Sequence, residues 1–276
     1  MSANNLPTLI TFDGEARSGK GTIVQATKDY LRDHEGYKVM LIDAGQVFRV
    51  LVSAARNAGV DIESPLAIDA FLGDEAEIEK CVQFVKKVYG MSKELREDML
   101  YAHDVGMASA KIGARPLSQT FKDRLLKKWL HDAGDEGFDI VLLDGRALED
   151  VGLQLEKDGL CQYVLGFYFT SDPVVGARRT LGFADTPYPR LGSLEKHQVD
   201  ELVKQIRLRN HADRERKVQP IVAPKGATRY VLPDIPEDKI LKKRAMFIFD
   251  TSADLAKDRM TQPIARFIGR CLKRLG

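Results

Sequence analysis

A glycine-rich segment near the start of the chain has the residue types and spacing of a phosphate-binding loop. The segment GEARSGKGT begins at Gly14, and its second glycine, Gly19, is followed directly by Lys20. In the GxxxxGK pattern the turn aims backbone N–H groups at phosphates, and the lysine reaches the outer phosphates of a nucleotide. Gly21 occupies the position where the usual pattern has Ser or Thr, and the hydroxyl comes one residue later at Thr22. The pattern predicts nucleotide binding.

The residues around this segment favour a functional loop over a glycine-rich turn without a ligand. TLITFD (8–13) is β-branched and apolar, which predicts a buried strand, and a helical pattern begins at Lys20. A helix N-terminus adds partial positive charge where the phosphates would lie. We therefore expect the whole segment to contact the nucleotide: Gly14, Glu15, Ala16, Arg17, Ser18, Gly19, Lys20, Gly21 and Thr22.

The rest of the chain alternates between strand and helix patterns, which favours an α/β fold with a mostly parallel sheet. Further strands are expected at 38–43, 138–146, 162–171 and 245–252. Helices are expected at 20–35, 46–59, 76–90, 118–134 and 194–217, and at the C-terminus. The sequence SDPVVGARR (171–179) is expected to open a further helix, with Ser171 or Asp172 as its N-cap. Residues 61–104 are charged and helix-prone, 182–194 have the composition of a loop, and 220–236 are rich in proline.

Composition excludes several classes of protein. Of 276 residues, 44% are hydrophobic and 30% are charged, which is ordinary for a globular enzyme. The net charge of +2 gives no global field for nucleic acid or membrane, and we expect neither as a partner. The basic tail RFIGRCLKRLG (266–276) is explained by an amphipathic terminal helix with a solvated face.

The expected location of the protein is the cytoplasm. Cys81, Cys161 and Cys271 lie far apart without a CxxC spacing, which argues against a metal site and a disulfide framework. No apolar run is long enough to span a bilayer, and the first residues, MSANNLPTLITFDG, lack the features of a signal peptide.

Four further segments carry a resemblance to one family. DAGQVFR (43–49) resembles the DTGAMYR-type segment of cytidylate kinases, and LDGRALEDVG (143–152) resembles their DGRDIGTVV-type segment. RNHADRERKVQP (209–220) resembles their RDxRDxxRxxxP-type segment, and GVDIE (59–63) also fits. The GKGT ending of the loop is similar to that of small nucleoside monophosphate kinases. Order and spacing agree from about residue 8 to residue 272.

The resemblance implies a P-loop kinase that transfers a phosphoryl group from ATP to CMP or dCMP with Mg²⁺. It implies one domain over residues 1–276, with a central five-stranded parallel sheet flanked by helices. A monophosphate-binding insertion at 61–117, helical here, and a short lid at 180–196 complete this fold. The resemblance also implies a monomer, the usual state of members of the family.

The residues make chemical sense for this reaction, because phosphoryl transfer needs positioning and neutralised charge more than covalent chemistry. A guanidinium can bind two phosphate oxygens at once. Helices that flank the expected lid carry further arginines: Arg178, Arg179, Arg209, Arg214 and Arg216. The residues expected in catalysis are Lys20, Asp144, Arg146, Arg178 and Arg179. Those expected to bind the acceptor are Asp43, Arg49, Arg146, Asp213 and Arg216, and Asp144 is expected to hold the metal through water.

The chain departs from the family pattern where cytidylate kinases read the base. Ala44, Ala110 and Ala147 replace two hydroxyl residues and an aspartate, and Gln119 replaces an arginine. Ser109 and Arg115 are near enough to substitute if the register shifts, and Glu15 and Arg17 stand where the loop of the family prefers Pro and Gly. Two other readings therefore stay open: a kinase of the same fold with a different acceptor, and an ATP-binding protein without catalysis.

Overall fold

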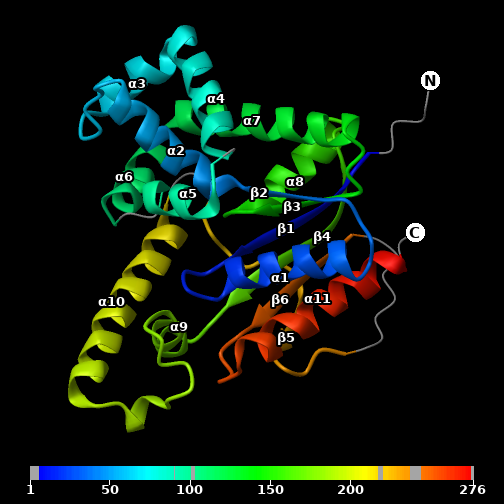
Figure 1. Ribbon diagram of the computed structural model, residues 1–276. Coiled ribbons are helices and arrows are strands. Elements are labelled where there is room, and N and C mark those ends of the chain that lie inside the picture. Colours follow the sequence, from blue (N-terminus) through cyan, green and yellow to red (C-terminus); the bar gives the residue numbers. More distant parts are fainter. Residues whose placement is uncertain (1–5, 90, 101–102, 217–219, 237–243, 275–276) are drawn as a thin grey trace. The chain divides into compact units, whose positions relative to one another are not determined.

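The computed structural model describes residues 6–89, 91–100, 103–216, 220–236 and 244–274 (Figure 1). The chain divides into two compact units. The first consists of Met1–Ile42 together with Ala133–Gly276, and the second is the continuous segment Asp43–Asp132. The motif at 209–220 and the insertion at 61–117 each include a few residues outside the described ranges.

A parallel sheet forms the centre of the first unit, as the alternating pattern predicts. Its strand order is β2-β3-β1-β4-β6-β5, and β1 pairs in parallel with both β3 and β4, while β6 pairs in parallel with β4 and β5. The strands are β1 (Thr8–Gly14), β2 (Val39–Asp43), β3 (Ile140–Asp144), β4 (Gln162–Thr170), β5 (Thr228–Val231) and β6 (Ala245–Asp250). The α/β fold expected from the sequence is confirmed.

Within the described ranges the sheet has six strands, so the expected number of five is wrong. The additional strand, β5, lies within the proline-rich stretch and is only four residues long. Its residues alternate between half-buried and exposed positions, as in a strand at the edge of a sheet. A short edge strand next to Pro233 gives a weak sequence signal, because proline and brevity both count against a strand.

Helices cover the sheet because the strands are apolar on both faces. Figure 1 shows α1 (Lys20–Asp33) beside α11 (Lys257–Lys273), and their apolar residues share one core with the sheet. Helix α8 (Leu148–Lys157), which the sequence pattern did not predict, packs against β1 and β4. Aromatic rings fill much of the core: Phe12, Phe167, Phe169, Phe247, Phe249 and Phe267.

Two helices of the first unit enclose the expected lid region. Helix α9 (Pro173–Thr180) starts with proline after the N-cap Asp172, whose carboxylate accepts hydrogen bonds from Val174 and Val175. It packs on α10 (Ser193–Glu215) through a separate apolar cluster that includes Ala177 and Val199. Between them lies a short 3₁₀ helix, η1 (Tyr188–Arg190), in the segment read as a loop.

The described residues of the second unit are helical apart from connecting segments, as expected for 61–117. Their core includes Val50, Leu51, Phe71 and Phe121. The helices are α2 (Ala44–Asn57), α3 (Pro65–Gly73), α4 (Glu75–Tyr89), α5 (Lys93–Leu100), α6 (His103–Gly113) and α7 (Pro116–Asp135). None of the helices in the described ranges is long and apolar enough to cross a lipid bilayer.

Candidate active site

The glycine-rich loop lies between β1 and α1, at the carboxyl end of its strand. Gly14 (φ +146°) and Gly19 (φ +81°) adopt conformations that side chains disfavour. A Cβ added at Gly14 would lie 2.7 Å from the backbone nitrogen of Phe169, so only glycine fits there. Gly19 is the N-cap of α1, and the first turn of this helix contains no acidic residue. The loop and helix thus present an N-terminus suited to an anion.

Neighbouring elements hold the loop in place through residues that sequence reasoning missed. The N–H of Ala16 donates to Asn210 Oδ1 of α10 at 2.8 Å, and the Thr251 hydroxyl after β6 donates to the carbonyl of Ser18 at 2.8 Å. Asn210 is buried and lies three residues before Asp213 on the same helix, a spacing that could have revealed it. The Ser18 hydroxyl is buried and lacks a hydrogen-bond partner within the described ranges.

Charged side chains gather at the carboxyl edge of the sheet, where the loop begins. Lys20 forms an ion pair with Asp144 at the end of β3, and Arg146, two residues later, forms one with Asp213 of α10. The structure thus brings together four residues that the sequence predicted separately. Ligands of parallel α/β sheets bind at this edge, because loops and helix N-termini converge there.

Two further charges lie within electrostatic range of this group. Burial lowers the pKa of Arg216, and Arg146 lowers it further, while Asp213 raises it. Burial also raises the pKa of Asp13, whereas Lys20 and Arg146 lower it. We call Asp13, Lys20, Asp144, Arg146, Asp213 and Arg216 the charged cluster. Asp13 was not predicted, although an acid that ends an apolar strand was visible in TLITFD.

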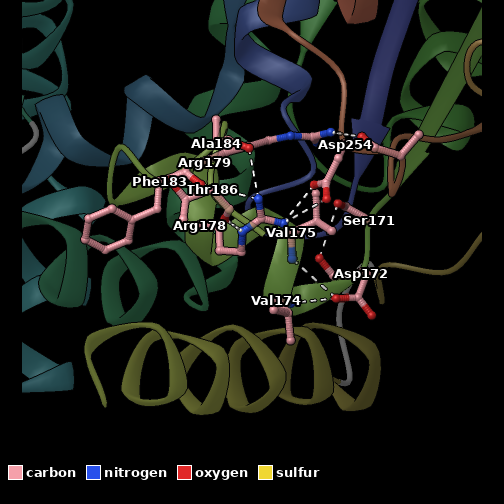
Figure 2. A network of polar contacts seen from close by, with 11 residues as sticks. Ser171, Asp172, Val174, Val175, Arg178, Arg179, Phe183, Ala184, Thr186 and Asp254 are labelled. Carbon is pink, nitrogen blue, oxygen red and sulfur yellow. Dashed lines mark hydrogen bonds and ion pairs between the residues drawn. The ribbon is translucent and has the colours of Figure 1, made fainter. Parts of the chain in front are cut away.

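Arg178 and Arg179, both expected in catalysis, differ in their surroundings (Figure 2). Arg178 is only 3% exposed. Its Nε donates to the carbonyl of Thr186 at 2.8 Å, Nη2 donates to that of Ala184 at 2.9 Å, and Nη1 donates to Asp254 at 2.8 Å. All three nitrogens therefore bind protein, and Arg178 ties the lid region to the segment after β6.

Arg179 makes fewer contacts. Its Nη2 donates to the carbonyl of Ala253 at 2.6 Å, and its Nη1 is buried with no hydrogen-bond partner among the residues described. Burial lowers the pKa of this guanidinium. Of the two arginines, Arg179 keeps the greater capacity to bind an additional anion.

Two of the expected acceptor-binding residues belong to the second unit. Asp43 is the N-cap of α2, where its Oδ1 accepts hydrogen bonds from Gly45 at 2.8 Å and from Gln46 at 3.1 Å. Arg49 Nη1, on the same helix, donates to the carbonyl of Leu100 at 2.8 Å. These contacts explain the local structure, and the binding roles of both residues stay predictions.

The positions that depart from the family pattern carry little polar chemistry. Ala44 is buried at the start of α2, and Ala147 is the N-cap of α8 with a φ of +52° and no side chain to cap the helix. The amide of Gln119 donates to the carbonyl of Gly113 at 2.5 Å. The side chain of Ala110, on α6, falls outside the described residues.

The residues nearest to these positions are engaged elsewhere. Arg115 forms a two-pronged ion pair with Asp69, and the Ser109 hydroxyl donates to the carbonyl of Gly106 at 2.8 Å. In the loop, Glu15 pairs with Arg214 at 3.4 Å, and Arg17 has a φ of +60°. Arg209 of α10 lies 3.9 Å from the Asp213 carboxylate.

No group of three or more His, Cys, Asp or Glu residues is arranged to hold a metal ion in the ranges that the structure describes. The cysteines Cys81, Cys161 and Cys271 are free thiols, and all three are buried. Burial raises the pKa of Cys81 to about 11 and that of Cys161 to about 12. Neither of these two thiols has the low pKa of a catalytic cysteine.

Comparison with known proteins agrees with this geometry. The family model described as cytidylate kinase matches residues 10–243. A cytidylate kinase of Vibrio vulnificus (strain YJ016) is 26% identical over 251 residues, covering 87% of this chain and 95% of that protein. A cytidylate kinase of Pseudomonas fluorescens (strain Pf0-1) is 26% identical over 247 residues, covering 87% and 94%. The match spans the phosphate loop, the charged cluster and most of the fold, and the chain belongs to the cytidylate kinase family.

Proposed function

We propose that this protein is a nucleoside monophosphate kinase that transfers the γ-phosphoryl group of ATP to CMP or dCMP. The observation that carries the proposal is the charged cluster, which gathers Lys20, Arg146 and Arg216 beside the phosphate loop. Three cations at one sheet edge suit two phosphorylated substrates. In the reaction an oxygen of the acceptor phosphate bonds to the γ-phosphorus as the bond to the β-phosphate oxygen breaks, and ADP leaves.

On the donor side, the loop and Lys20 bind the phosphates of ATP. The N–H groups at the start of α1 donate hydrogen bonds to phosphate oxygens, and Lys20 exchanges its partner Asp144 for phosphate oxygens. Arg179 supplies a further donor through the buried Nη1. Donors that are held in place before the reaction stabilise the charge that develops in the transition state.

On the acceptor side, Arg146 and Arg216 bind the monophosphate, and Asp213 binds the sugar. Arg146 is oriented by its ion pair with Asp213. In the second unit, Arg49 stays a proposed ligand of the acceptor, because a guanidinium suits a phosphate. Asp43 caps the helix that carries Arg49.

The residues present fit a magnesium ion held mainly by the nucleotide. Mg²⁺ favours phosphate oxygens and water over an all-protein cage. It would neutralise charge on the transferring phosphoryl group. Asp144 is the carboxylate of this chain that we expect to orient its water, because it ends β3 beside Lys20.

A kinase of the same fold with a different acceptor is the second candidate. It is favoured by Ala44 and Ala147, which remove polar groups from positions where the family reads the base, and by Gln119, which replaces the charge of an arginine with a neutral amide. A lost hydrogen-bonding partner changes discrimination strongly, by factors of about 10⁴ in favourable cases. The phosphate-handling residues are present in either case.

The test is a coupled assay for ADP formation with ATP and a panel of acceptors: CMP, dCMP, UMP, AMP, GMP and TMP. We expect turnover that depends on the acceptor, is greatest with CMP or dCMP, and is lost in Lys20→Ala. The control is Lys28→Ala, which removes a lysine further along α1. ATP binding without turnover of any acceptor would identify a non-catalytic protein, and turnover confined to another acceptor would reject the cytidine assignment.

We also infer a cytoplasmic, monomeric protein with no nucleic-acid or membrane partner. The buried free thiols suit a reducing compartment. Sedimentation of the purified protein with and without ATP tests the monomer, and a mass of twice 30.9 kDa would contradict it.

A further inference from the structure

One carboxylate joins the first glycine of the phosphate loop to the start of another helix. Asp13, near the end of β1, is 9% exposed. Its Oδ1 accepts the N–H of Gly14 at 2.6 Å, and its Oδ2 accepts the N–H of Leu148 at 3.1 Å. Gly14 opens the phosphate loop, and Leu148 is the first residue of α8, which packs against β1.

Helix α8 needs this contact because its own N-cap is apolar. The first N–H groups of a helix have no partner inside the helix, and a side-chain oxygen at the N-cap usually accepts one of them. Ala147 has no such oxygen, and no side chain of the N-cap residue caps α8. The carboxylate of Asp13, on strand β1, caps the helix instead by accepting the N–H of Leu148. Its negative charge also interacts favourably with the positive end of the helix dipole.

The same carboxylate lies within the field of cations on both sides of the reaction. Lys20, on the donor side, and Arg146, on the acceptor side, both lower the pKa of Asp13 against the effect of its burial. Arg146 is also two residues from Leu148 along the chain, so a hydrogen bond at Leu148 restrains the backbone that carries Arg146.

We propose that Asp13 is a positioning residue that holds the phosphate loop and Arg146 in a fixed relation, so that donor and acceptor phosphates meet at reacting distance. The proposal rests on the proposed function for its consequence in catalysis. Reacting groups must be placed accurately, and a displacement of about 1 Å can reduce a rate about 100-fold. Asp13 itself touches no reacting atom.

The decisive variant is Asp13→Asn, which keeps the size of the side chain. Its amide accepts through one oxygen only and turns an NH₂ group toward the second N–H, so one of the two hydrogen bonds is lost. We expect kcat to fall about 100-fold, with KM for ATP and for the acceptor changing less than about threefold. The matched control is Asp139→Asn, directly before the amino end of β3. The Asp139 carboxylate also accepts a hydrogen bond from a backbone N–H, that of Lys38, at 2.7 Å. This control should leave kcat unchanged.

A second measurement does not depend on activity. Hydrogen exchange at the start of α8, residues 146–150, is compared with and without a non-hydrolysable ATP analogue. In the parent protein we expect the analogue to slow exchange there, because Asp13 transmits the ordering of the loop to Leu148. In Asp13→Asn the analogue should still bind, as seen by thermal shift, yet leave exchange at 146–150 unaltered.

The outcomes separate this proposal from the proposed function. If the parent protein turns over no acceptor, the kinase assignment fails, and the exchange measurement still decides the role of Asp13. Unchanged kcat in Asp13→Asn, or analogue-dependent protection of 146–150 equal to that of the parent, would overturn the positioning role. A loss of kcat that is equal in Asp139→Asn would reduce Asp13 to a general contributor to stability.

Discussion

The carboxyl edge of the sheet and the positions expected to read the base contrast in their polar chemistry. At the sheet edge, Lys20 and Arg146 are each paired with an aspartate. Arg216 lies within the field of Asp213, Arg146 and Asp13. Among the base-reading positions, Ala44 is buried at a helix start and Ala147 caps α8 without a side-chain oxygen. One region is rich in paired charge and the other is short of hydrogen-bonding groups.

This difference indicates that holding phosphates and choosing a base are separable properties of the fold. Every phosphoryl transfer needs cations around the same oxygens, whichever base the acceptor carries. The choice of base depends on a few hydrogen bonds, which single substitutions can remove. For the proposed kinase activity, the contrast predicts that phosphate binding follows the family pattern while the choice of base depends on other groups.

The largest expected effect tests the phosphate side of the contrast. Lys20→Ala removes the cation beside the loop, and we expect kcat to fall about 1,000-fold with every acceptor, because the lost charge acts on ATP itself. Steady-state kinetics with two acceptors measures this. A loss confined to one acceptor would contradict the assignment of Lys20 to the donor side.

Arg146→Lys keeps the positive charge and removes the forked geometry. We expect kcat/KM for the acceptor to fall about 100-fold, while the affinity for ATP stays within a factor of about three, because a lysine cannot bind two phosphate oxygens and Asp213 together. The control is Arg244→Lys, which disrupts the ion pair of Arg244 with Glu156 at the start of β6. An equal loss in both variants would show that Arg146 acts through stability alone.

Arg178→Met tests whether this arginine supports the lid region more than the reaction. The change leaves the carbonyls of Ala184 and Thr186 without their donor. We expect the free energy of unfolding to fall by about 2 kcal/mol, since unpaired buried groups cost about 1–3 kcal/mol. Urea denaturation measures the loss, and Arg190→Met, an exposed arginine of η1, serves as the control. Full stability combined with abolished kcat would instead assign Arg178 to catalysis.

The smallest effect concerns the base-reading side. Ala147→Asp restores the carboxylate of the family pattern, and we expect the preference for CMP over UMP to rise about tenfold. A carboxylate accepts a hydrogen bond from the amino group of cytosine, which uracil lacks. Ala147→Asn is the matched control, because both side chains tolerate a φ of +52° and can cap α8. Equal gains in the two variants would exclude a role for the charge.

Much of the fold was predictable because its signals are local. Apolar β-branched runs marked β1 and β3, an amphipathic pattern marked α7, a charged helix-prone composition marked α10, and glycines at fixed spacing marked the candidate phosphate loop. The motif segments also singled out Lys20, Asp144 and Arg146, which lie at the start of α1, at the end of β3 and two residues after β3. Their functional roles stay predictions. In these cases the neighbouring residues of the chain carry the information.

The amino-acid sequence by itself determined the fold class, the family and the types of residue at the phosphate site. The tertiary structure decided which partners those residues have. It placed the guanidinium of Arg178 among the lid carbonyls, gave Asn210 the N–H of Ala16, and set Asp13 between Gly14 and Leu148. Two of these contacts, Asn210 with Ala16 and Asp13 with Leu148, join residues that lie far apart along the chain. They exist only because packing of the sheet and helices brings them within hydrogen-bonding distance, which no local pattern encodes.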